Sequence, residues 1–341
     1  MTPPKRPPQT VTVLGAGIAG AGAARAFAAR GCEVTLIAPS GIADGASGVP
    51  SAALRPRLWR PTAHAAPDAE ILAGAFRWTS GWLRGAASKH FRACGVLLCA
   101  VDPNDEVKVR DRATNPATAD VVQWCEAAEA SRHAGVELPF GAAWIPTGGC
   151  VDLGGLVREL LEDARVTVCS QHITETTDLV VDARARVPNG EVVRGQALGV
   201  ALGAAAPSAV ICTNGYLCPP GEDGLTWLGS TYDRHDERTD ERPQDDHRIL
   251  DRFGALPALA EALQATPTKR RFAALRASTP QRIALVGFAA PDLAVTLGHG
   301  SRGAVTGPWA GELLAAAAFG EPLPATPAHW ARLQSRAAQH T

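Results

Sequence analysis

The beginning of this 341-residue chain contains the feature that most restricts its fold. Residues 10–38 read TVTVLGAGIAGAGAARAFAARGCEVTLIA. Apolar residues at 11–14 predict a short buried strand, 21–30 an Ala-rich helix, and 34–37 the next parallel strand. Between the first strand and the helix lie three glycines in the spacing G-x-G-x-x-G. This order predicts a βαβ unit that binds a dinucleotide.

Each glycine of the motif has a physical reason. Gly15 permits the tight turn, Gly17 lets a pyrophosphate approach the backbone, and Gly20 lets the helix pack close to the strand. Ile18 and Ala19 lie where the helix begins. There, free N–H groups and the positive end of the helix dipole favour phosphate charge.

The alternative is a structural βαβ turn that binds nothing. One observation supports it: the acid expected at the end of the second strand, for the adenosine ribose, is missing. Ala38 stands at about that position, and the nearest carboxylate downstream is Asp44. A bound ribose must therefore use other groups, or be held more weakly.

The composition excludes several classes of protein. The chain is 46% hydrophobic and 20% charged with a net charge of -1, so an RNA substrate would need a local basic patch. Residues 1–9 are too polar for a signal peptide and are expected to be a disordered lead-in. No apolar run is long enough to span a membrane, so a cytoplasmic protein is expected. The eight cysteines form no C-x-x-C pair, so they indicate neither a metal site nor a redox dithiol.

Hydrophobic periodicity predicts the remaining elements. The expected helices are 69–85, 121–131, 153–163, 249–263 and a long helix opened by the glycine turn within 297–320. The expected strands are 96–101, 143–152, 166–169, 179–182, 210–215, 229–232, 272–276 and 283–287, with a local hairpin at 198–203.

Five blocks in this order resemble the D-amino-acid-oxidase-like family of FAD-dependent amine oxidoreductases. They are GAGIAGAG at 15, GASG at 45, GGCVDLGGLVREL at 148, LRASTPQRIALVG at 275 and LGHGSRGAVTGPWAGELLA at 297. Within the family, three details resemble the oxidoreductase half of a bifunctional tRNA-modification enzyme. These are GASG followed by AAL, GSTY followed by a charged loop, and GSRG followed by ELLAA. The absent acid at Ala38 is also a feature of this subgroup.

The resemblance implies an α/β fold in which an FAD-binding Rossmann-like domain, of glutathione-reductase and D-amino-acid-oxidase type, is interleaved with a smaller α+β substrate domain. The expected FAD-binding parts are 10–80, 148–216 and 275–341, and the expected substrate-domain parts are 81–147 and 217–274. The substrate domain is expected to be reduced, because the chain between Gly215 and Trp227 is short for the family.

The resemblance further implies a non-covalent FAD. The expected cofactor-binding residues are Gly15, Gly17, Ile18, Ala19, Gly20, Gly45, Ala46, Ser47, Gly48, Ala53, Asn214, Gly215, Gly298, Gly300, Ser301, Arg302 and Gly303. Residues 300–303 would place a helix N-terminus at the pyrimidine edge of the flavin, where negative charge develops on reduction.

Three side chains are expected at the reaction itself. Arg276 lies where relatives hold the substrate carboxylate, and its planar guanidinium grips a carboxylate bidentately. Its alternative is a surface or structural arginine. Tyr232 either lines the pocket or packs in the core. His299 either touches flavin or substrate or is a structural hydrogen-bonding residue, the commoner role.

The resulting hypothesis is an enzyme that oxidises the C–N bond of a glycine-like secondary amine, with the carboxymethylaminomethyl group of a tRNA wobble uridine as favoured substrate. One alternative is an oxidase of glycine, sarcosine or a D-amino acid, and another is a non-catalytic flavin-binding partner protein. Two basic patches, Arg55–Arg57–Arg60 and Lys269–Arg270–Arg271, could hold RNA phosphates or be solvated surface. A separate methyltransferase is a possible partner, because no methyltransferase half precedes residue 10.

Overall fold

A six-stranded sheet is built around the βαβ unit in this computed structural model, which describes residues 3–62, 66–171, 176–187 and 189–338. The strand order is β17-β18-β10-β1-β2-β9, and neighbours are parallel except β17 and β18. The bounds are β1 Thr10–Leu14, β2 Glu33–Ile37, β9 Val166–Cys169, β10 Leu179–Asp182, β17 Leu285–Ala290 and β18 Leu293–Leu297. The predicted βαβ unit is confirmed, with α1 (Ile18–Ala28) between β1 and β2.

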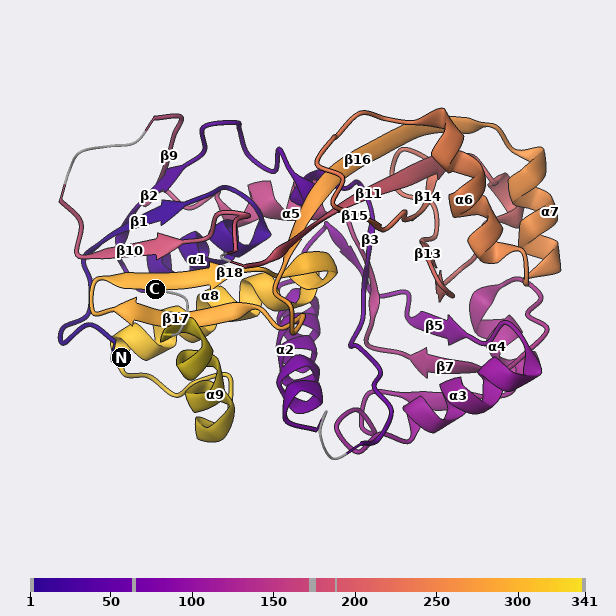
Figure 1. The fold of residues 1–341 in the computed structure, drawn as a ribbon, viewed down its shortest axis with the longest axis horizontal. Helices are drawn as coiled ribbons and strands as arrows, with labels where there is room; N and C mark the ends of the chain where they lie inside the picture. Colours follow the sequence, from indigo (N-terminus) through magenta and orange to yellow (C-terminus); the bar gives the residue numbers. More distant parts are fainter. Residues whose placement is uncertain (1–2, 63–65, 172–175, 188, 339–341) are drawn as a thin grey trace.

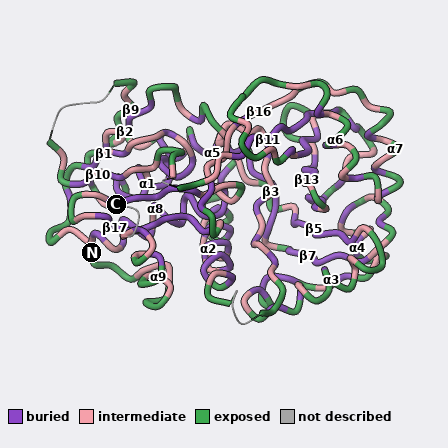
Figure 2. Tube along the Cα trace, in the orientation of Figure 1, coloured by how far each residue is buried: buried purple, intermediate pink, exposed green. Residues whose placement is uncertain are grey.

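Helix α8 (Gly303–Phe319) lies against α1 on this sheet, and it is the long C-terminal helix that the sequence predicts. Glycines bring the two backbones together. A Cβ on Gly311 would lie 2.3 Å from the carbonyl carbon of Gly22, and a Cβ on Gly22 would lie 2.8 Å from the Cα of Pro308. The burial colours of Figure 2 show α8 as a largely buried stretch, and its terminal residues Gly303 and Phe319 are half-buried.

Two further helices complete this half. Helix α5 (Leu153–Leu160) also packs on α1, and its N-terminal N–H of Gly155 donates to the carboxylate of Asp152. Helix α9 (Pro327–Ala338) covers the edge strand β17. The side-chain amide of Gln334 bonds both the N–H and the carbonyl of Phe288, so it replaces a neighbouring strand at that edge.

The second half of the molecule is a nine-stranded mixed sheet, seen at the right of Figure 1. Its order is β15-β11-β14-β13-β12-β5-β7-β6, with β16 paired to β11. The bounds are β5 Val96–Cys99, β6 Gln123–Cys125, β7 Ala142–Ile145, β11 Glu191–Val200, β12 Val210–Cys212, β13 Tyr216–Leu217, β14 Thr226–Gly229, β15 Asp233–Arg234 and β16 Thr268–Ser278. Its helices are α3 Pro103–Ala113, α4 Ala127–Ala134, α6 Asp246–Leu250 and α7 Pro257–Ala265.

The two halves meet along long elements. Strands β11 and β16 pair over almost their whole length and run diagonally from the second half to the first (Figure 1). Helix α2 (Ala66–Gly85) stands between the halves, and its Thr79 hydroxyl donates to the carbonyl of Val305 in α8. A small antiparallel sheet of β3 (Ala52–Leu54), β8 (Gly149–Val151) and β4 (Phe91–Arg92) lies beside them.

Sheet membership differs in part from the sequence expectation. Strands β11 and β12 pair within the second sheet, although residues 148–216 were assigned to the cofactor-binding domain. The predicted parallel strand at 210–215 does run parallel to a neighbour, but that neighbour is β5. The division of the chain into two domains stays a prediction.

Several element predictions are wrong, for identifiable reasons. Residues 121–131 are not one helix, because Gln123–Cys125 pair with β7 at the edge of the second sheet before α4 begins. The expected hairpin at 198–203 is the end of β11, which is continuous because β14 and β16 flank it on both sides. The expected helix at 249–263 is broken, because Pro257 starts a new helix at its first position.

The lead-in is ordered before residue 10. The Cys32 thiol donates to the carbonyl of Pro8 at 3.1 Å, and the N–H of Gln9 donates to the carboxylate of Asp178 at 2.8 Å. The expectation of disorder is therefore wrong for residues 8 and 9, because they extend β1 along its neighbours. Among the described residues, no helix combines the length and apolar character that crossing a membrane requires.

Candidate active site

A cavity of about 880 Å³ lies where the two halves meet, and the predicted site residues converge on it. Arg276, Tyr232 and His299 all line it, and so do the predicted cofactor-binding residues except Gly20 and Gly48. Gly20 serves the turn itself, because a Cβ there would lie 1.8 Å from the carbonyl oxygen of Gly15. A Cβ on Gly48 would lie 2.5 Å from the carbonyl oxygen of Ala43, so this glycine permits a close approach within the loop.

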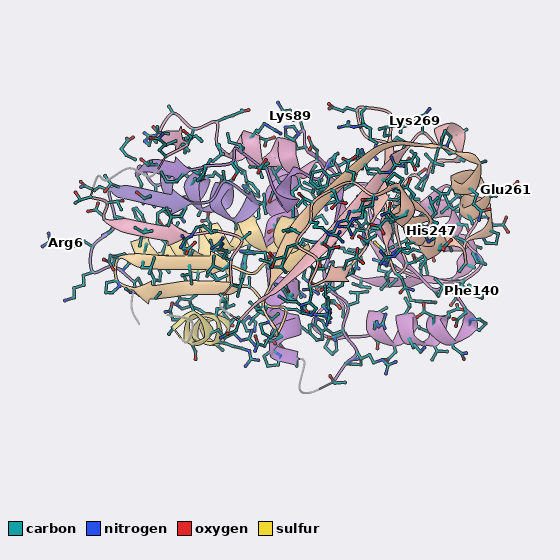
Figure 3. All side chains as sticks on the ribbon, turned by 45° about the horizontal axis from the view of Figure 1, so that its top comes forward. Arg6, Lys89, Phe140, His247, Glu261 and Lys269 are labelled. Carbon is teal, nitrogen blue, oxygen red and sulfur yellow. The ribbon has the colours of Figure 1, made fainter. Side chains whose placement is uncertain are left out.

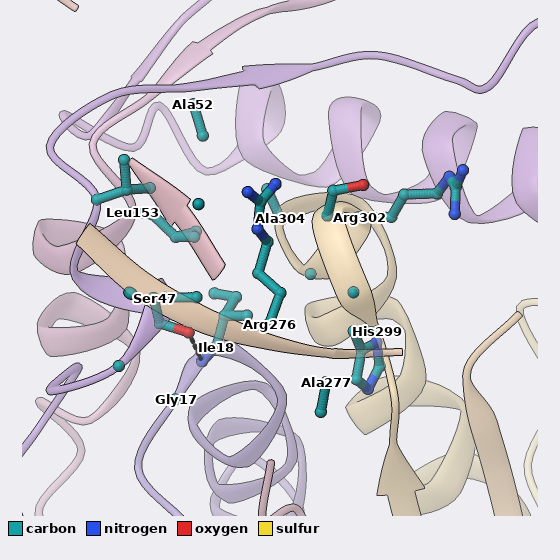
Figure 4. Close-up of a pocket in the computed structure, with 18 of the residues that line it drawn as sticks. Gly17, Ile18, Ser47, Ala52, Leu153, Arg276, Ala277, His299, Arg302 and Ala304 are labelled. Atoms are coloured by element: carbon teal, nitrogen blue, oxygen red, sulfur yellow. Dashed lines mark hydrogen bonds between the residues drawn. The ribbon is translucent and has the colours of Figure 1, made fainter. Parts of the chain in front are cut away.

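The first end of the cavity is the glycine turn before α1. Gly15 has φ +107°, a conformation that favours glycine, and its N–H donates to the carbonyl of Ile37. The N-cap residue Gly17 offers no side-chain cap, and the first turn of α1 contains no acid. The hydroxyl of Ser47 accepts from the N–H of Ile18 at 3.0 Å, which Figure 4 draws as a dashed line. The remaining N–H groups at this helix start are thus available to an anion.

The position of the missing ribose acid is also part of the cavity wall. Ala38 lines it, and so do Ser40 and Asp44 from the loop that follows β2. That loop is held against the glycine turn by the N–H of Ala43, which donates to the carbonyl of Ala16. The groups that could replace the absent acid are therefore Ser40 and Asp44.

Next to the glycine turn before α1, the cavity wall continues with the glycine turn before α8. Gly298 and Gly300 have φ +71° and +54°, and α8 begins at Gly303 without a side-chain cap. A Cβ on Gly303 would lie 3.0 Å from a methyl carbon of Ile18. The starts of α1 and α8 therefore come together, and two uncapped helix N-termini face the same cavity.

Arg276 extends from β16 into the cavity (Figure 4). Its Nη2 donates to the hydroxyl of Ser230 at 3.1 Å and to the carbonyl of Thr231 at 2.9 Å. Gly195 on the paired strand makes room, since a Cβ there would lie 1.6 Å from the same nitrogen. Burial lowers the pKa of the guanidinium from its usual value. No carboxylate of the described residues is ion-paired with it, so its other nitrogens are available to a ligand.

Both tyrosines of the chain line this part of the cavity. The predicted Tyr232 is 38% exposed, and its ring centroid lies 5.7 Å from the guanidinium carbon of Arg276. Tyr216, which the sequence analysis missed, is buried enough that its phenol pKa is raised. Ser230 belongs to the GSTY block, whereas Tyr216 belongs to no recognised motif and comes next to that block through the pairing of β13 with β14.

His299 is held at both ring nitrogens. Thr306 donates its hydroxyl hydrogen to the carbonyl of Arg302 at 3.0 Å, so Nδ1 of His299 must donate to Thr306 Oγ1, 2.7 Å away. Nε2 then accepts from the Thr296 hydroxyl at 2.9 Å. Burial lowers the pKa of the imidazole to about 4. A neutral ring with both nitrogens occupied favours the structural alternative, because it joins β18 to the first turn of α8.

The cavity wall is rich in arginine. Eight of the lining residues are arginines: Arg55, Arg57, Arg184, Arg234, Arg252, Arg276, Arg282 and Arg302. Asp44 is the one carboxylate among the lining residues. The sequence pointed to Arg55 and Arg57 as part of a basic patch, but Arg60 of that patch does not line the cavity. Arg282 lies within the block LRASTPQRIALVG at 275, but the sequence did not single it out as a site residue.

The second basic patch lies elsewhere. Lys269 is exposed on the outer surface of the second half, as Figure 3 shows. Arg271 bonds the carboxylate of Asp246, and Arg270 lies 3.6 Å from that of Asp223. None of these three residues lines the cavity, and two of the three charges are already balanced.

One group of possible metal ligands lies outside the cavity. Ligand atoms of Cys125, Glu129 and His133 are within 4.8 Å of one another, although the sequence indicated no metal site. Burial raises the pKa of the Cys125 thiol to about 11, which opposes the thiolate that binds metals. His133 also stacks on Trp144 at a centroid distance of 4.2 Å, which accounts for it as a packing residue.

Comparisons with known proteins bear on this cavity. The family described as "DAO: FAD dependent oxidoreductase" matches residues 10–317. The chain is 31% identical over 95% of its length to the tRNA 5-methylaminomethyl-2-thiouridine biosynthesis bifunctional protein MnmC of Chromohalobacter salexigens. It is 30% identical over 93% of its length to the MnmC protein of Pseudomonas putida. It spans 56% and 58% of these two relatives.

Solved structures share the fold. Glycine oxidase from Geobacillus kaustophilus superposes with a TM-score of 0.77 at 16% identity, covering 92% of this chain and 95% of that one. Iminodiacetate oxidase from Chelativorans superposes with a TM-score of 0.72 at 22% identity, covering 94% and 98%. At these identities the likeness concerns the fold, and it confirms the expected α/β class.

Proposed function

The chain belongs to the DAO family of FAD-dependent oxidoreductases, and from that premise we propose that it oxidises a glycine-like secondary amine at the carbon next to nitrogen. The favoured substrate is the carboxymethylaminomethyl group of a tRNA wobble uridine. FAD, when bound, supplies the acceptor for the hydride of that carbon, and the resulting imine is hydrolysed. The observation that carries the proposal is Arg276, a cavity arginine without a carboxylate partner beside two uncapped helix starts.

The lining residues fit a non-covalent FAD. The N–H groups at the start of α1 and the close backbone approach at Gly17 suit the pyrophosphate. Ser40 and Asp44 are the groups available to the adenosine ribose in place of an acid at Ala38. The start of α8, with Gly300 and Gly303, offers N–H dipoles to the flavin end, where they stabilise negative charge.

Arg276 orients the substrate. Its Nη2 is occupied by Ser230 and Thr231, which fixes the plane of the guanidinium. The free edge then binds the substrate carboxylate and determines which carbon faces the flavin. The amine binds as the neutral base, because His299 has no free nitrogen to accept its proton. Tyr216 and Tyr232 form the walls of this region and exclude water.

The tRNA substrate is favoured by the relatives. The two MnmC proteins named above are described as tRNA biosynthesis proteins, and a carboxymethylaminomethyl-uridine is in effect an N-substituted glycine. Arg276 could therefore bind the carboxylate of the tRNA group in the same way as the carboxylate of a free amino acid. We also propose a cytoplasmic location and a methyltransferase as a partner.

The small-amine alternative has its own support. The folds of glycine oxidase and iminodiacetate oxidase are similar, and the Arg276 geometry suits a free N-carboxymethyl amine equally well. A non-catalytic flavin-binding partner protein is the remaining alternative from the sequence. It is disfavoured by the unpartnered charge of Arg276, which a scaffold does not require.

Absorbance of the purified protein, followed by anaerobic mixing, tests the proposal. We expect a yellow protein that is bleached by tRNA carrying the carboxymethylaminomethyl group and not by glycine or sarcosine. Bleaching by a small amine alone would move the function to amino-acid oxidation. Flavin that neither kind of substrate reduces would favour the partner protein, and a protein that takes up no FAD would contradict every version.

A further inference from the structure

Among the described residues, six of the eight arginines that line the cavity form no ion pair with an Asp or Glu: Arg252, Arg276 and a group of four. We refer to Arg55, Arg57, Arg282 and Arg302 as the arginine cluster. None of them forms an ion pair with an Asp or Glu of the described residues, whereas Arg184 pairs with Asp182 and Arg234 with Glu191. The hydrogen bonds of the cluster go to carbonyls: Arg55 donates to Pro56 and Arg302 to Arg282. Four like charges thus lie together without compensation from the chain.

The guanidinium groups of the cluster repel one another, and two of them, those of Arg57 and Arg302, are partly buried away from solvent. The charges of Arg57, Arg55 and Arg282, added to burial, lower the pKa of Arg302 to about 10. Burial together with Arg282 and Arg55 likewise lowers the pKa of Arg57. The Nη1 atom of Arg57 is buried and has no hydrogen-bond partner, while its guanidinium carbon lies 3.8 Å above the Trp59 ring. A buried unpaired donor in a like-charge group is unfavourable unless a ligand supplies an anion.

The cluster lies at a defined distance from Arg276. The Tyr232 ring contacts both, with its centroid 5.7 Å from the guanidinium carbon of Arg276 and 5.9 Å from that of Arg282. The two carbons are therefore at most about 12 Å apart. This places a second cationic site within reach of one substrate molecule whose carboxylate is held by Arg276.

We propose that the arginine cluster is a second anion subsite, which binds the phosphate groups of a nucleotide substrate whose carboxylate is bound by Arg276. The inference rests on the proposed function and specifies its substrate class. Glycine and sarcosine have one carboxylate and a single carbon between it and nitrogen, so they cannot reach both sites. A modified uridine in a chain has phosphodiesters on both sides, and arginine forks match phosphate oxygens.

The cluster overlaps the expected cofactor site at Arg302 only, because Arg55, Arg57 and Arg282 are not among the expected cofactor-binding residues. The residues assigned to the FAD pyrophosphate are Gly15, Gly17 and Ile18 at the start of α1, which are not members of the cluster. A phosphate effect measured on FAD-loaded protein therefore reports a different subsite. A substrate with a second carboxylate would use the same guanidinium groups, so the experiment needs separate arms for phosphate and dicarboxylate.

The first experiment measures binding without turnover. FAD-loaded protein is titrated calorimetrically with inorganic phosphate, and separately with malonate, at constant ionic strength. Wild type should bind phosphate more tightly than malonate, and Arg57→Gln and Arg282→Gln should each weaken phosphate about tenfold or more. The control Arg165→Gln, an exposed arginine paired with Asp163, should bind phosphate as wild type does. Equal binding by all four proteins, no binding by wild type, or preference for malonate would overturn the proposal.

The second experiment separates this inference from the proposed function. The KM for carboxymethylaminomethyl-uridine is compared with the KM for its 5′,3′-bisphosphate, in wild type and in Arg57→Gln. The phosphates should lower KM about tenfold or more in wild type and much less in the variant, with kcat for the two substrates similar. Oxidation of both substrates with one common KM would refute the phosphate subsite and leave the proposed function intact. Phosphate binding without oxidation of either substrate would retain the subsite and reject the proposed function.

Discussion

At the scale of single residues, the role of each polar side chain in the site is set by the hydrogen bonds that it already makes within the protein. Arg276 has one nitrogen held by Ser230 and Thr231 and the others available, so it is oriented before a ligand arrives. His299 differs, because both of its ring nitrogens are satisfied within the protein. The first is thus suited to binding a substrate, and the second to holding the turn that precedes α8.

Replacing Arg276 tests its role as the carboxylate anchor. Arg276→Ala should lower kcat/KM by about 10²- to 10³-fold, because two charge-assisted hydrogen bonds to the substrate are lost. Arg276→Lys should recover part of the activity, since it keeps the charge without the fork. Steady-state kinetics measure the effect, and the flavin absorbance of both variants should match wild type. Unchanged kinetics in Arg276→Ala would show that another group binds the carboxylate.

His299 makes folding stability depend on pH. Its pKa is about 4 in the folded protein and about 6.5 when unfolded, so the unfolded state binds more protons between these values. The stabilisation is present above about pH 6.5 and is lost as pH falls, by about 2 kcal/mol at pH 5. Urea unfolding of wild type and His299→Gln at pH 7 and pH 5 should show a larger loss for wild type. Equal losses would mean that the imidazole is not held neutral.

At the scale of elements, the contact between α1 and α8 sets the geometry of the cavity. Both helices begin at the cavity, and their glycines let the backbones approach closely behind it. The close contact brings Gly303 next to Ile18, so the two helix starts lie side by side. A change in the spacing of these helices would therefore displace both anion-binding ends at once.

Gly311→Ala tests this packing. The added methyl would lie 2.3 Å from the Gly22 carbonyl carbon, so the helices must separate, which should lower the free energy of unfolding by about 1–3 kcal/mol. The matched control is Gly81→Ala in α2, where no atom lies within 4 Å of the new Cβ. That exposed helical change should stabilise by about 0.5–1 kcal/mol. Denaturant unfolding of both variants checks the contrast, and a stabilised Gly311→Ala would contradict the packing account.

Predictions from the sequence were most accurate for elements whose conformation depends on residues close together in the chain. The βαβ unit and the turn before α8 follow from glycine spacing and nearby apolar residues, and Arg276 lay within a recognisable block. The edge strand at 123–125 and the long strand β11 were missed, because their conformation depends on partners far along the chain. Tyr216 was missed for the same reason, since sheet pairing brings it to the cavity. Ser230 and Arg282 lie in recognised blocks, but the sequence does not show which side chains of a block face the cavity.

At the scale of the whole molecule, the cavity lies where the two sheets meet. The first hydrophobic cluster runs through both halves, because it includes α1 and α8 as well as Val96, Ile145 and Val210 of the nine-stranded sheet. The second cluster lies between that sheet and the helices α4, α6 and α7. The ribbon of β11 and β16 and the helix α2 are the long elements that connect the halves (Figure 1). A ligand in the cavity therefore contacts residues from both halves.

FAD should consequently stabilise the entire fold. Binding to the folded state alone adds about 2.7 kcal/mol when free FAD is 100 times its Kd, and the melting temperature should rise with FAD concentration. Gly17→Val, which would place its side chain against the Ser47 hydroxyl, should lose this rise. Thermal unfolding at several FAD concentrations measures the effect. A melting temperature independent of FAD in wild type would contradict binding in this cavity.

Because the chain has few tyrosines and they line the cavity, their spectroscopic signals report on ligand binding there. The chain has two tyrosines, and both line the cavity that Arg276 enters. A protein grown with ring-fluorinated tyrosine would therefore produce two fluorine resonances, each originating at the site. The half-buried Tyr216 should resist ionisation to higher pH than an ordinary phenol, because desolvation raises its pKa. Arrival of an anion beside Arg276 could then be followed atom by atom, without turnover and without any label introduced by mutation.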